Sequence, residues 1–161
     1  MPEKPLPPEL ILSLLAETPQ RLDALITDLT EAQLHTPPNP GEWSASEVLA
    51  HLRSCADVWG GCIAKIIAED RPTLRAINPL TWIKQTNYLD LEYRPSLHTF
   101  TTQRAELLAL LEPLPLADWS RSATVTGAGK PLERTVHFYA EWLARHERQH
   151  VKQVATIAST L

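Results

Sequence analysis

The fold is decided by the stretch LERTVHFYAEWLARHERQHVKQVATIA, residues 132–158. Its apolar positions recur at alternating steps of three and four, which is the spacing of one face of an α-helix. The stripe consists of Leu132, Val136, Tyr139, Leu143, His146, His150, Val154 and Ile157. We therefore predict one long amphipathic helix from about Leu132 to Ala158.

Two positions of this stripe are histidines, where leucine or isoleucine would be usual. A buried imidazole needs a partner or carries a desolvation cost of about 1–3 kcal/mol. His146 and His150 are four residues apart, so their rings leave a helix in the same direction and can close on one metal ion. A shared metal would satisfy both rings.

The segment HERQH, residues 146–150, also fits the HExxH pattern of zinc proteases. Those enzymes take a third ligand from downstream, but the eleven residues after His150 include no His, Asp, Glu or Cys. The protease interpretation therefore fails unless an upstream residue substitutes. Glu147 is a weak candidate for a catalytic base, and we favour the alternative that it pairs with a neighbouring arginine.

The remainder of the chain predicts three further main helices, over about 8–34, 44–70 and 95–112. Pro19 should kink or split the first near Thr18. Ser44 and Glu47 form a capping box at the start of the second. The connection over 71–94, with room for a short helix over 79–89, is long enough for the third helix to run parallel to the second. Residues 123–135 form either a small hairpin or a plain loop.

These elements predict an all-α fold: a four-helix bundle in one domain over residues 1–161, with a long connection between the second and third helices. The formal net charge is −4, and lysines and arginines form no run, which argues against a nucleic-acid partner. No apolar stretch approaches the roughly 20 residues that cross a bilayer. The segment Met1–Pro8 carries four prolines and no apolar signal core, so we expect a cytoplasmic protein.

A catalytic zinc-like site requires a third protein ligand and an open position. The best candidate is His51, which lies among the apolar positions of the second helix and can face the last helix in a bundle. His137 falls on the opposite face of the last helix, His35 falls in a proline-rich loop, and His98 stays open as an alternative. The predicted metal ligands are therefore His51, His146 and His150.

Two cysteines, Cys55 and Cys62, fall on the apolar face of the second helix, about 10 Å apart along its axis and too far for a disulfide. Cys55 follows His51 by one turn, so it could be a fourth ligand or a redox-sensitive neighbour. We favour a third interpretation, in which both cysteines are small buried apolar residues.

Three segments together resemble the DinB-like (YfiT-like) superfamily of metalloenzymes: PGEWS at 40–44, VLAHL at 48–52 and ARHERQH at 144–150. The resemblance implies a four-helix bundle and a divalent metal, zinc or nickel, held at the positions of His51, His146 and His150. It also implies use of a low-molecular-weight thiol, as in the thiol-dependent S-transferases and maleylpyruvate isomerase of the family, and a homodimer.

From the residues and the resemblance together, we expect a metal-dependent enzyme, with thiol-dependent S-transfer to small electrophiles as the leading reaction. The partners would be a small-molecule substrate or thiol, with neither nucleic acid nor a membrane. The alternatives are a metal-dependent hydrolase, a non-catalytic metal- or ligand-binding bundle, and a structural dimer whose histidines only hydrogen-bond. An open coordination position would favour an enzyme.

Overall fold

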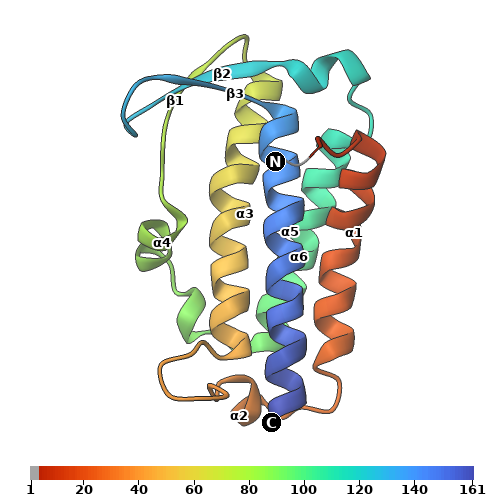
Figure 1. Cartoon of the computed structure of the whole chain (residues 1–161), viewed down its shortest axis with the longest axis vertical. Coiled ribbons are helices and arrows are strands. Elements are labelled where there is room, and N and C mark those ends of the chain that lie inside the picture. The colour runs from red at the N-terminus through yellow and green to blue at the C-terminus, as the bar shows by residue number, and fades with distance from the viewer. Residues whose placement is uncertain (1–3) are drawn as a thin grey trace.

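A computed structural model describes residues 4–161 as a four-helix bundle with a small sheet across one end (Figure 1). The first three residues of the proline-rich N-terminal segment lie outside that range. The long helices are α1 (Pro8–Leu25), α3 (Ala45–Ala68), α5 (Tyr93–Leu111) and α6 (Val136–Thr160). Both α3 and α5 run toward the sheet, as the colours of Figure 1 show, while α1 and α6 run away from it. The predicted parallel arrangement of the second and third main helices is confirmed.

The long connection carries short helices and packs beside α3. It holds α4 (Pro79–Trp82) and two 3-10 turns, Ile83–Gln85 and Tyr88–Asp90. Another 3-10 turn, Leu116–Ser120, follows α5. Within the described residues, no helix has the length and apolarity needed to cross a membrane.

The sheet corrects the all-α prediction. Strands β2 (Ser122–Thr126) and β3 (Leu132–Thr135) form the antiparallel hairpin, with Val125 opposite Leu132. Strand β1 (Thr73–Arg75), which pairs in parallel with β2, was not predicted from the sequence. Three residues are too few to show the alternation that identifies a strand.

The last helix starts later than predicted. Leu132 belongs to β3 and is 43% exposed, so it is not part of the buried stripe. The helix begins at Val136 because Thr135 caps it: the Thr135 hydroxyl accepts a hydrogen bond from the backbone N–H of Phe138. From there the predicted apolar positions are buried in the core: Val136, Tyr139, Leu143, Val154 and Ile157.

The first predicted helix is two helices, and the break is not at Pro19. α1 continues through Pro19 to Leu25, and the chain becomes helical again in α2 (Glu31–Leu34). Proline lacks the N–H that would bond the carbonyl of Leu15. The Arg104 guanidinium of α5 donates to that carbonyl over 2.9 Å, so the orphaned acceptor is satisfied and the helix is not split.

The start of α3 follows the predicted capping box. The Ser44 hydroxyl accepts from the backbone N–H of Glu47, and the Glu47 carboxylate accepts from the backbone N–H of Ser44. This fixed start places the buried face of α3 against α6, and the candidate site lies between these two helices.

Candidate metal centre

Three histidine rings meet between α3 and α6. The Nε2 atom of His146 lies 3.2 Å from Nε2 of His51 and 3.1 Å from Nε2 of His150. The ring centroids of His51 and His150 are 4.9 Å apart, and His51 is only 8% exposed. The structure therefore brings together the three histidines that the sequence analysis selected, although His51 is 95 residues from His146.

This arrangement fits a divalent cation. Zinc–nitrogen bonds of about 2.0–2.1 Å place two nitrogens on one tetrahedral ion roughly 3.3 Å apart, close to the separations seen here. The Nε2 atom of His146 has two close nitrogen neighbours, and one proton can bridge only one of these two pairs. A cation accepts the lone pairs of all three nitrogens at once.

The tautomer of His150 is set by an outer hydrogen bond. Nδ1 of His150 lies 2.7 Å from Oε1 of Gln153, one turn further along α6. The amide oxygen can only accept, so Nδ1 carries the proton and Nε2 keeps its lone pair. Ligating histidines in metalloproteins are usually held in this way.

The rings of His51 and His146 are neutral at pH 7. Burial, assisted by repulsion from the neighbouring His150, lowers the pKa of His51 to about 4. Burial and repulsion from His150 and His51 likewise lower the pKa of His146 to about 4. Neutral imidazoles can give their lone pairs to a metal without first losing a proton.

Cys55 lies beside this cluster but is not aligned as a ligand. Its sulfur is 3.6 Å from Nε2 and 4.0 Å from Nδ1 of His51, and it is fully buried. The Nε2 lone pair points away from Nδ1, so a sulfur sharing an ion with Nε2 would be much farther from Nδ1. Cys55 instead lies alongside the ring, although ligand atoms of Cys55, His51 and His146 all fall within 4.8 Å of one another. Burial raises the pKa of its thiol far above the ordinary range.

Glu147 points into a different part of the core. Its fully buried carboxylate accepts from Arg104 of α5, with Nη1–Oε1 at 2.7 Å, and from the Thr18 hydroxyl at 2.9 Å. This geometry gives Glu147 a structural role between α6, α5 and α1. The pairing partner is an arginine 43 residues away in sequence, which the sequence analysis did not identify.

The remaining histidine candidates lie elsewhere. The half-buried His137 donates from Nε2 to the carbonyl of Leu6 over 2.7 Å. The exposed His35 lies 3.4 Å from Glu31, and His98 is exposed on α5. The structure thus separates all three from the cluster.

Indole rings border the cluster. Trp43 stacks on His150 at 6.3 Å between centroids, and Trp59 meets His146 edge-on at 5.3 Å. Trp142 lies 5.7 Å from Trp59 and is 48% exposed. These rings form an apolar margin that suits the flat or apolar part of a small molecule.

The outer hydrogen bond to His150 gives a first prediction. Replacing Gln153 by Ala removes the acceptor at Nδ1, and we expect metal affinity to fall about 10–100-fold. Gln149→Ala changes the same residue type at an exposed site on α6 and should have no effect. Competition with a chromogenic chelator measures both, and equal affinities for the two variants would contradict the orienting role.

The chain is similar to known proteins over most of its length. A family model described as the DinB superfamily matches residues 14–154. A protein of Geobacillus kaustophilus is 28% identical over 145 residues, which are 86% of this chain and 77% of the relative. A protein of Bacillus licheniformis is 27% identical over 141 residues, which are 86% of this chain and 79% of the relative. Both carry the name "Putative metal-dependent hydrolase".

The fold also matches a solved structure. YfiT from Bacillus subtilis, described as "a probable metal-dependent hydrolase with an unusual four-helix bundle topology", superposes with a TM-score of 0.82 at 18% identity. The match covers 99% of this chain and 91% of YfiT. At that identity the match shows a shared fold.

Proposed function

Because the chain belongs to the DinB superfamily, we propose that it is a metal-dependent enzyme acting on a small molecule. The observation that carries this proposal is that Nε2 of His146 lies within 3.2 Å of Nε2 of both His51 and His150, with the Cys55 sulfur to one side of the His51 ring. A divalent cation held by His51, His146 and His150 would supply Lewis-acid chemistry and lower the pKa of a water or thiol that reaches it.

The role of the chain's own residues is to hold the cation and to orient the substrate. The three histidines would bind the cation from two helices whose packing fixes the separation of the rings, and Gln153 keeps the His150 ring in the ligating tautomer. Trp43, Trp59 and Trp142 exclude water from the margin of the site and offer flat surfaces to a substrate.

Hydrolysis of a small substrate is the first candidate reaction, and the names of the two curated relatives support it. Water would form a bond to the electrophilic carbon of the substrate, the bond to the leaving group would break, and the proton released by the water would have to reach the leaving group. Glu147, the carboxylate nearest the histidine pair in sequence, is held by Arg104 and is not free to take that proton.

Because Glu147 is paired with Arg104 and is not free to act as a base, a second candidate reaction is favoured, the transfer of a low-molecular-weight thiol to a small electrophile. A thiol has an ordinary pKa of about 8.5, so a nearby cation can ionise it without a protein base. Its sulfur would form a bond to carbon of the electrophile, whose leaving group departs with the electron pair.

The test is a turnover screen of protein purified without an affinity tag, using generic esters, amides and electrophiles with and without added thiol. We expect turnover that disappears on chelation and returns with zinc or nickel. A rate independent of thiol identifies hydrolysis, and a rate that requires thiol identifies transfer. Metal-loaded protein that turns over none of these substrates would support a non-catalytic metal-binding protein and contradict the proposal.

A further inference from the structure

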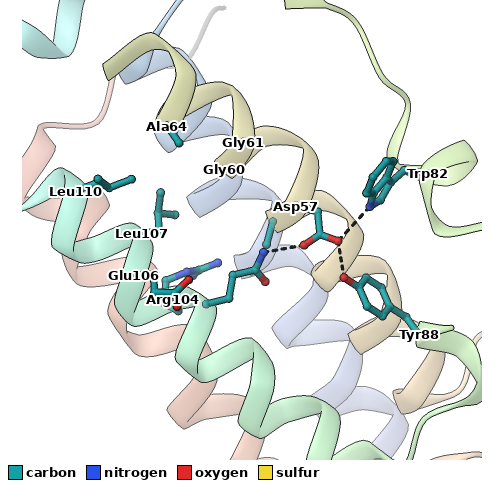
Figure 2. A pocket seen from close by; sticks show the side chains of 12 residues that line it. Asp57, Gly60, Gly61, Ala64, Trp82, Tyr88, Arg104, Glu106, Leu107 and Leu110 are labelled. Atoms are coloured by element: carbon teal, nitrogen blue, oxygen red, sulfur yellow. Dashed lines mark hydrogen bonds between the residues drawn. The ribbon is translucent and has the colours of Figure 1, made fainter. Parts of the chain in front are cut away.

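A hollow of about 510 Å³ lies between α3 and α5, and none of the three histidines lines it. Figure 2 shows its lining, with the connection between α3 and α5 closing one end through Trp82 and Tyr88. A hollow of this size can hold a small organic molecule.

Apart from Asp57, the residues that α3 contributes to the wall are all glycine or alanine. Gly60 and Gly61 occupy the middle of this helix, where glycine weakens helical structure relative to alanine. A Cβ built at either position meets no other atom within 4 Å, and neither glycine needs a positive φ. No neighbouring element demands these glycines, and their effect is to keep the hollow wide opposite Leu107 and Leu110 of α5.

The end nearest the connection is polar and is built around Asp57. Its Oδ2 accepts from the Trp82 indole N–H at 3.0 Å and from the Tyr88 hydroxyl at 2.6 Å, and its Oδ1 accepts from the Gln103 amide at 2.7 Å. A carboxylate has about four lone-pair sites, so Oδ1 can accept once more. Gln103, which also lines the hollow, donates to Asp57 through its amide nitrogen, so its amide oxygen is a further acceptor.

The charged residues that line the hollow are predominantly negative. Asp57 and Glu106 line the hollow, and Arg104 is the cation among the described lining residues. The Arg104 charge is neutralised by Glu147 in the core. Arg53 stacks on the ring of Tyr88, with its guanidinium carbon 3.9 Å from the centroid, and is not a lining residue.

We propose that this hollow binds a small organic ammonium ion with an apolar chain. The ammonium group donates to Asp57 and Gln103, and the chain lies along the glycine wall opposite Leu107 and Leu110. An anion of the same shape is repelled by Asp57 and Glu106, and a neutral molecule lacks the charge that completes the Asp57 site.

The test uses hexylammonium as the probe, titrated into the metal-loaded protein by isothermal calorimetry. We expect a Kd on the order of 1 mM, and propylammonium to bind at least about tenfold more weakly because three methylenes are lost. Hexanoate, which carries the opposite charge on a similar chain, should not bind. Binding of hexanoate as strong as that of hexylammonium, or no heat with hexylammonium at millimolar concentration, would overturn the proposal.

Two variants locate the site. Asp57→Asn should weaken hexylammonium binding about tenfold or more, and Gly60→Leu should fill the hollow and abolish binding while Asp57 and its hydrogen bonds remain. Gly60→Leu also removes a helix-weakening residue, so its melting temperature should not fall. Unchanged affinity in the folded Gly60→Leu protein would overturn the proposal even if Asp57→Asn failed to fold.

Two controls exclude other sites. Glu112→Gln removes an exposed carboxylate at the end of α5 and should leave binding unchanged. His146→Ala should bind hexylammonium as tightly as the parent protein. Loss of binding in His146→Ala would place the amine at the histidine cluster and overturn the assignment to the hollow.

Discussion

Replacing His146 by alanine is expected to remove the bound metal almost completely. Its Nε2 atom lies close to both of the other ligating nitrogens, 3.2 Å from Nε2 of His51 and 3.1 Å from Nε2 of His150. Without it, two ligands remain on facing helices. The loss of affinity should exceed the roughly 10–100-fold that removal of an outer hydrogen bond costs. Metal analysis of tag-free protein should show the bound metal falling from about one ion per chain to a trace.

The matched control is His137→Ala, the same substitution nine residues earlier on the same helix. His137 bonds the Leu6 carbonyl and lies outside the cluster, so its removal should leave the metal content unchanged. Equal metal content in the parent and both variants would mean that His146 is not a ligand. A loss of metal in His137→Ala alone would mean that the ligating face of α6 had been misassigned.

The histidine cluster could be anticipated because its geometry is local on each helix. A four-residue spacing fixes the relative direction of His146 and His150, and the capping box at Ser44 fixes where α3 begins and hence which face carries His51. The pairing of α3 with α6 then follows from their apolar stripes. These patterns give the direction in which a side chain leaves its helix but not its distance from a neighbouring ring, so they could not place the Cys55 sulfur alongside the ring of His51.

The missed features depend on contacts between distant segments. β1 exists because three residues of the connection reach β2, which lies about fifty residues later in the chain. Leu132 fits the apolar spacing of the last helix, but it lies in strand β3, where it pairs with Val125 of the hairpin. Arg104 donates a hydrogen bond to the Leu15 carbonyl, which has no helical partner because of Pro19, and it also pairs with Glu147. Nothing in the local sequence of α5 indicates either contact.

The ion pair between Glu147 and Arg104 leads to the largest expected effect on stability. Glu147→Gln leaves the guanidinium of Arg104, which is 3% exposed, without its counter-charge. Breaking a buried pair by removing one partner costs about 3–5 kcal/mol, and urea denaturation should show a loss of that size. Glu17→Gln is the matched control, because Glu17 pairs with Arg21 on the surface at 2.9 Å and such pairs contribute about 0.3–0.5 kcal/mol.

The same variant decides between the two roles open to Glu147. If the residue is structural, folded Glu147→Gln protein keeps its metal and its turnover. The double variant Arg104→Met/Glu147→Gln should then lose less stability than the sum of the losses of the two single variants, because no charge is left buried without a partner. If Glu147 is instead a catalytic base, its replacement would abolish turnover while costing no more stability than Glu17→Gln. The bidentate contact with Arg104 and the hydrogen bond from Thr18 favour the structural outcome, since both carboxylate oxygens are already occupied.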